Sequence, residues 1–140
     1  MPNPQGKKFT VTSTIPYADP IALVLFQTGT NAPTVVVNQN DPVVDVFETK
    51  RNGPGNYEID CKNADGSYRN DIFVKGKTEV LWGGLSDAQS SARCVILSGS
   101  SLQVFTGYDK VNLTNGATYQ QGADSQMGDY GLAIKITVYP

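Results

Sequence analysis

Short strand-like segments, separated by turn residues, are the feature that most restricts the fold of this sequence. Apolar and polar residues alternate over residues 57–61 and 132–139, which is the period of a strand with one buried face. No apolar stripe at positions i, i+3, i+4 and i+7 persists over three helical turns in the 140 residues. The pattern therefore predicts an all-β protein.

Strand-like runs recur roughly every 10–15 residues, a spacing typical of sandwiches and barrels. The run over residues 21–27 is apolar almost throughout, which predicts a central strand buried on both faces. The polar stretch over residues 114–129 predicts the longest irregular loop. The predicted strands cover residues 8–13, 21–27, 34–38, 43–48, 57–61, 72–74, 78–82, 92–97, 102–105 and 132–139, with a short strand at most over 111–113.

A single domain is predicted, because no linker divides the chain and no repeat of fixed period occurs in it. The predicted fold is an antiparallel β-sandwich over residues 9–140, either jelly-roll or immunoglobulin-like, with a β-barrel as the alternative. Residues 1–8 contain two prolines and a glycine, which predicts an extended N-terminal arm.

The chain contains no histidine, which excludes several kinds of active site. Histidine is the usual partner of a nucleophilic serine or cysteine and the commonest metal ligand. The acidic neighbours Glu58 and Asp60 lie on the polar face of a predicted strand, where solvated carboxylates are expected anyway. The turn over residues 63–67 resembles a calcium loop but lacks its terminal acidic ligand. We therefore expect a non-enzymatic protein with no catalytic residues, no cofactor and no metal.

Charge and hydropathy restrict the partners and the location of the chain. The net charge is −2 and the basic residues are scattered, so we expect no nucleic-acid partner. The longest apolar run, over residues 21–26, is far shorter than the ~20 residues of a membrane-spanning helix. Residues 1–8 have no apolar signal region, so we expect synthesis in the cytoplasm without a signal peptide.

Cys61 and Cys94 are the two cysteines, and each lies in a predicted strand. Two cysteines alone cannot form a structural zinc site, and their separation is not that of a redox C-x-x-C motif. Two interpretations stay open. The cysteines are buried thiols that act as small apolar residues, or they form a disulfide that joins two strands.

Four aromatic residues lie in or next to polar, glycine-rich segments and are candidate ligand-binding residues. Aromatic faces with neighbouring amide and carboxylate groups suit carbohydrate, and such residues also pack in cores or cap loops. These four residues are Trp82, Tyr108, Tyr119 and Tyr130.

Several turn and strand motifs occur in a familiar order along the chain. They are Q-T-G-T-N-A-P-T over residues 27–34, G-N-Y-E-I over 55–59, F-V-K-G-K-T over 73–78 and I-K-I-T-V-Y over 134–139. This order resembles small all-β structural proteins of phages and prophages, notably those of Bacteroidetes hosts. The resemblance implies a component of a virion, such as a fibre, a tail part or a capsid decoration, and it implies no catalytic residues.

The first functional hypothesis is therefore a non-enzymatic structural or assembly protein of a phage-like particle. Its expected partners are copies of itself or other particle proteins. The expected location is the virion, with the cytoplasm as the alternative. The second hypothesis is a carbohydrate-binding or adhesin-like β-sandwich whose partner is a surface glycan.

Overall fold

The computed structural model describes residues 18–86 and 89–140, and the chain folds there into two antiparallel sheets. The predicted arm over residues 1–8 and the predicted strand over residues 8–13 lie outside these residues. The four-stranded sheet has the order β2-β1-β9-β5. Its strands are β1 (Asp19–Phe26), β2 (Thr34–Asn40), β5 (Thr78–Trp82) and β9 (Leu132–Val138).

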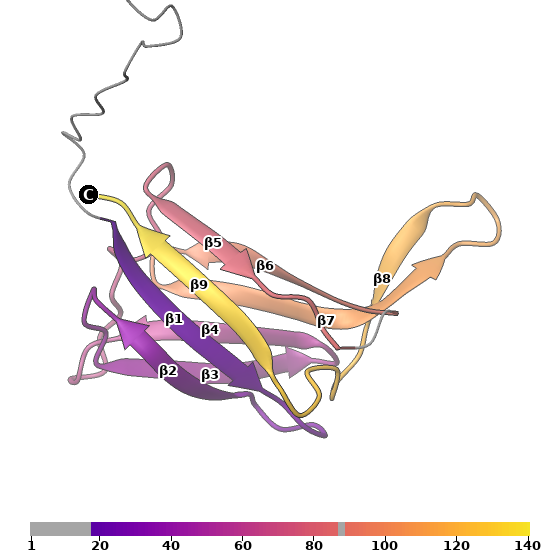
Figure 1. Cartoon of the computed structure of the whole chain (residues 1–140), viewed down its shortest axis with the longest axis horizontal. Helices are drawn as coiled ribbons and strands as arrows, with labels where there is room; N and C mark the ends of the chain where they lie inside the picture. Colours follow the sequence, from indigo (N-terminus) through magenta and orange to yellow (C-terminus); the bar gives the residue numbers. More distant parts are fainter. Residues whose placement is uncertain (1–17, 87–88) are drawn as a thin grey trace, which may run out of the picture.

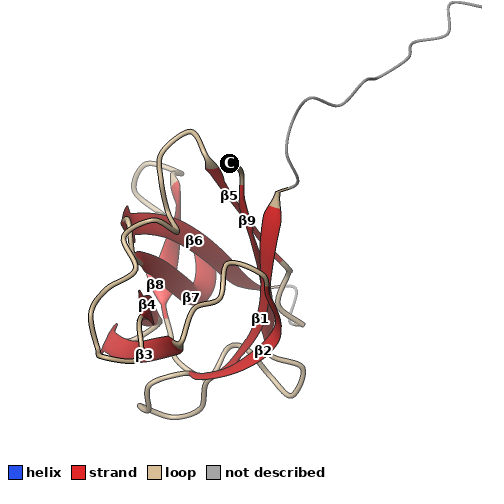
Figure 2. Cartoon of the chain, turned by 90° about the vertical axis from the view of Figure 1, so that its left-hand side faces the viewer, coloured by secondary structure: helices blue, strands red, loops and turns tan. Residues whose placement is uncertain are grey.

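The five-stranded sheet has the order β3-β4-β7-β6, and β8 pairs with the far part of β7. The two sheets face one another as layers (Figure 2), and the β7–β8 hairpin projects beyond them (Figure 1). The predicted β-sandwich is thus confirmed, and the barrel alternative is wrong because no strand pairing joins the two sheets within the described chain. The strands are β3 (Val46–Gly53), β4 (Asn56–Lys62), β6 (Ser90–Ser98), β7 (Ser101–Val111) and β8 (Thr118–Gly122).

The core consists of every second residue of the central strands. In the four-stranded sheet, Leu23 of β1 is paired with Ile134 of β9, and both are at most 2% exposed. In the five-stranded sheet, Ile59 of β4 is paired with Leu102 of β7, and both are fully buried. Burying one such aliphatic side chain stabilises a fold by about 1.5–3 kcal/mol. The alternation in the sequence therefore places apolar side chains between the two sheets, and their burial stabilises the sandwich.

Three predicted segments differ from the structure. Residues 72–74 form no strand, since Ile72 and Phe73 are buried in a loop whose Phe73 amide donates to the Gly99 carbonyl oxygen. The polar stretch over residues 114–129 contains β8, a strand of threonine, tyrosine, glutamine and glycine. Strand β7 continues to Val111, where two short strands were predicted. The pairing with β8 supplies the hydrogen bonds that this polar part of β7 needs.

Asp124 joins the chain after β8 to the β3–β4 hairpin. Its Oδ2 accepts a 2.7 Å bond from Arg51 Nη2, and its Oδ1 accepts bonds from the Tyr57 hydroxyl at 2.6 Å and the Gly55 amide at 3.0 Å. Gly55 has φ +62, and a Cβ there would lie 2.0 Å from the Thr106 carbonyl oxygen. Glycine at this position therefore permits the close approach on which the Asp124 contacts depend.

We expect the Asp124→Asn variant to be less stable than the wild type at neutral pH. Hydrogen bonds from Arg51, Tyr57 and Gly55 lower the pKa of Asp124 to about 2, against about 3.9 for an unfolded Asp. A lowered pKa stabilises the fold above pH ~4, and this stabilisation is lost as the pH falls towards 2. At pH 7 the free energy of unfolding of the wild type should exceed that of the variant by on the order of 1–2 kcal/mol.

Urea unfolding of both proteins between pH 2 and 7 measures this difference. The difference should shrink as the pH falls from about 4 towards 2. Asp129→Asn, which changes an exposed residue of the same loop, is the matched control and should leave the free energy of unfolding nearly unchanged. A difference for Asp124→Asn that stays constant over this pH range would contradict the account.

Candidate functional site

The outer faces of the two sheets differ in chemistry. On the five-stranded sheet, β3 and β4 direct alternating charged side chains outward, and these pair with one another. Lys50 Nζ lies 2.7 Å from Asp60 Oδ2 and 3.6 Å from Glu58 Oε2, and Lys62 Nζ lies 2.8 Å from Glu48 Oε2. This face carries a network of opposite charges, which suits contact with water.

The neighbouring carboxylates of Glu58 and Asp60 belong to this network. Asp60 is 1% exposed and accepts a 2.5 Å bond from the Ser101 hydroxyl. Burial opposes its ionisation, but the hydrogen bonds from Lys50 and Ser101 prevail and lower the pKa of Asp60. Burial and the neighbouring Asp60 raise the pKa of Glu58. Because Lys50 and Ser101 already cover Asp60, this pair has no room for a substrate between its carboxylates.

The centre of the outer face of the four-stranded sheet is mostly apolar. Across its centre, Val36 of β2 is paired with Val24 of β1, which is paired with Ala133 of β9. The next row brings Ala22 of β1 beside Lys135 of β9 and Leu81 of β5. Val36 is 48% exposed and Leu81 is 54% exposed, so this apolar surface is open to solvent.

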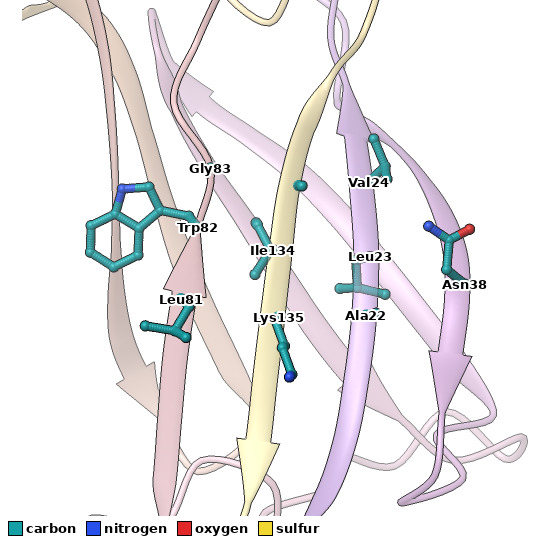
Figure 3. Close-up of a pocket in the computed structure, with 10 residues that line it drawn as sticks. Ala22, Leu23, Val24, Asn38, Leu81, Trp82, Gly83, Ile134 and Lys135 are labelled. Carbon is teal, nitrogen blue, oxygen red and sulfur yellow. The ribbon is translucent and has the colours of Figure 1, made fainter.

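Small side chains at the centre of this face create an open pocket, shown in Figure 3. Ala22, Gly83 and Ala133 have at most one side-chain carbon each and lie among larger neighbours from all four strands. The pocket has a volume of about 290 Å³, and Lys135 is the one charged residue among the described residues that line it. An apolar hollow with a single cation at its side suits an apolar group, alone or attached to an anion. We name it the outer-face pocket.

The sequence did not predict the residues of the outer-face pocket as a site. Residues 21–27 were expected to be buried on both faces, and this prediction is wrong because Ala22 and Val24 are only half-buried on the outer face. An apolar run predicts a strand whose two faces are both covered, and here one of the two faces has no cover within the described chain. The all-apolar run was therefore the signal of an exposed apolar surface.

The four candidate aromatic residues do not form one platform. Trp82 lines the outer-face pocket, but its indole Nε1 donates a 2.8 Å bond to the Ala92 carbonyl oxygen of β6, and its ring lies on the side of β5 away from β9 (Figure 3). Tyr108 and Tyr119 lie on the paired strands β7 and β8 and share one face of that hairpin. Tyr130 is 86% exposed in the loop before β9.

Cys61 and Cys94 are free thiols in the structure. They lie on β4 and β6, which are separated by β7, so the arrangement does not join them in a disulfide. Burial raises the pKa of both thiols to about 12. They are therefore protonated at neutral pH and act as small apolar residues of the sandwich.

Comparisons with protein families, with curated proteins and with solved structures gave no significant match. Within residues 18–86 and 89–140, no three His, Cys, Asp or Glu side chains are grouped so that they could hold a metal ion. The same residues include no helix long and apolar enough to cross a membrane. The function is therefore argued from the surfaces described above.

The dye anilinonaphthalene sulfonate combines an apolar ring system with an anion and should bind at the outer-face pocket. Ala133→Phe fills the pocket and should abolish the dye's fluorescence gain, and Lys135→Gln should weaken binding severalfold because it removes the cation. Thr137→Phe is the matched control, since Thr137 lies on the same face of β9 but does not line the pocket. Equal dye binding by Ala133→Phe and the wild type would contradict the assignment.

Proposed function

We propose that this chain is a non-enzymatic structural or assembly protein that associates through the outer face of its four-stranded sheet. The observation that carries this proposal is the contrast between the two outer faces. The charges of Lys50 and Asp60 are paired on one sheet, whereas Val24, Val36 and Leu81 are directed to solvent on the other. Exposed apolar surface of this kind marks an interaction site.

A sheet face of this kind suits protein partners better than small substrates. Removing apolar surface from water contributes about 25 cal/mol for each Å² buried, and a flat face offers that gain to another flat surface. The resemblance to phage structural proteins supports a place in a phage-like particle, with copies of the chain or other particle proteins as partners.

Sedimentation velocity of the purified protein tests the proposal. The wild type should associate as its concentration rises, and Leu81→Glu should weaken this association at least roughly tenfold, because it replaces an apolar side chain of the interface with a charged one that loses its water on association. Val95→Glu is the matched control, since Val95 is a 42% exposed valine on β6 of the other sheet. Weakening by Val95→Glu but not by Leu81→Glu would contradict the proposed surface.

The alternative function is carbohydrate binding, favoured by one observation. Trp82 is 42% exposed beside the outer-face pocket, and its bond to Ala92 fixes the orientation of its ring. In that case a glycan array should give a ligand whose binding is lost in Trp82→Ala while the melting curve stays cooperative. Unchanged glycan binding by Trp82→Ala would contradict the alternative.

A further inference from the structure

Strand β2 is an edge strand without the usual protection. It pairs with β1 on one side, and no strand of the described residues pairs with its other side. Edge strands commonly carry charged residues or proline, which discourage pairing with another chain. The edge strands β3, β5 and β6 contain charged residues, but the seven residues of β2, T-V-V-V-N-Q-N, contain neither a charge nor a proline. The five residues of the edge strand β8, T-Y-Q-Q-G, also lack both, but they include no aliphatic side chain.

A valine of β2 lacks the cover that its position calls for. Val37 is paired with Leu23, so it faces the same interior side of the sheet, yet Val37 is 43% exposed whereas Leu23 is 1% exposed. The sandwich is open along this side of β2. A further strand at this edge would cover Val37 and would pair with the free backbone groups of β2.

The chain itself contains a segment with the matching chemistry. Residues 9–15, F-T-V-T-S-T-I, are uncharged and alternate Phe9, Val11 and Ile15 with threonines. This is the pattern of a strand with one apolar face. Two lysines precede the segment and a proline follows it, and these 17 N-terminal residues lie outside the described part of the chain.

We infer that residues 9–15 of one copy add as an antiparallel strand to the free edge of β2 of a neighbouring copy. The charges favour this direction. Asp19 and Asp41 lie at the Asn40 end of β2, where an antiparallel segment places its lysines. A parallel segment would instead place its lysines at the Thr34 end, where the Pro33 carbonyl oxygen accepts a bond from Thr49 of β3. There the carboxylates of Asp60 and Asp124 are already paired with Lys50 and Arg51 of β3.

The length of the connection requires that the segment come from a second copy. An antiparallel segment on β2 ends at Thr34, whereas β1 of the same chain begins beside Asn40, at the opposite end. The ends of β2 are separated by about 20 Å, at ~3.3 Å for each of its residues. The four steps from residue 15 to Asp19 span at most roughly 14 Å. The same chain therefore cannot supply the segment in this direction.

This exchange deepens the proposed function and rests on it, because it names a second copy as the partner. Each copy offers one segment and one β2 edge. Reciprocal exchange between two copies closes a dimer, and exchange in one direction closes into a ring or continues as a filament. Phe9, Val11 and Ile15 would lie on the interior side, over Val37, and the threonines would face solvent.

A proline in the exchanged segment tests the inference in the full-length chain. Thr12→Pro removes a backbone donor and should weaken association in sedimentation velocity at least roughly tenfold. At concentrations too low for association, the variant should melt at the same temperature as the wild type, which separates a loss of association from a loss of folding. Thr12→Val is the matched control and should associate as the wild type does or more tightly. Unchanged association of Thr12→Pro would overturn the inference.

Cross-linking tests the direction and the partner in a Cys94→Ala background. A Thr10→Cys variant mixed with a Gln39→Cys variant should give a disulfide-linked dimer on oxidation. Cross-linking of Thr10→Cys to Thr34→Cys instead would overturn the antiparallel direction. A disulfide within one chain of the doubly substituted Thr10→Cys, Gln39→Cys protein, formed at low concentration, would overturn exchange between copies.

The two proposals fail separately. If Leu81→Glu abolishes association and Thr12→Pro leaves it unchanged, the outer face mediates assembly and strand exchange is overturned. If Thr12→Pro abolishes association and Leu81→Glu leaves it unchanged, strand exchange holds and the proposed surface is overturned. A wild type that does not associate at any concentration would overturn both.

Discussion

The packing of two apolar rows across the sandwich is the interaction on which the rest of the structure depends. Ile and Leu side chains of β1 and β9 meet those of β4 and β7, and the buried members are almost wholly shielded from water. A strand has a period of two, so each inward residue fixes an outward neighbour. The core therefore determines which residues lie on the outer faces. The packing of the core does not determine whether those outward residues are polar or apolar.

The outward residues of the two sheets differ in chemistry. On the five-stranded sheet, the outward residues of β3 and β4 include acids and lysines whose charges neutralise one another. On the four-stranded sheet, the outward residues at the centre are alanine, valine and leucine with the single cation Lys135, and their differing sizes leave the outer-face pocket. The unprotected edge of β2 borders the same apolar face. Face and edge together form one continuous region of the molecule, and this is the region that we propose for contact with another copy.

Sequence periodicity predicted most of this fold, because alternation is a local property that each strand shows by itself. The strand over residues 132–139 was found within one residue at its C-terminal end, and β5 was found with its bounds. Strand β8 was missed because its polar residues are held by pairing with β7, which is a contact between segments. Ile72 and Phe73 have side chains typical of strands but are buried in a loop. The apolar run over residues 72–74 therefore predicted a strand where the structure has none.

The candidate site was harder to predict, for the same physical reason. Ala22 and Ala133 are more than a hundred positions apart and meet only through the pairing of β1 with β9. Likewise, the contact of Asp124 with Arg51 has no local signature in the sequence. The aromatic residues Trp82 and Tyr108 were grouped by composition, but they lie on strands of different sheets. What the sequence did show was an apolar run without a polar face, and this run marks the exposed surface.

Amide hydrogen exchange, measured by mass spectrometry at low and high protein concentration, tests the central claim that the chain associates through its four-stranded sheet. Raising the concentration should slow the exchange of β2 and of β5, the two edge strands of this sheet, while β3, β6 and β8 exchange as before. Slower exchange confined to the strands of the five-stranded sheet, or exchange that does not depend on concentration, would contradict the account.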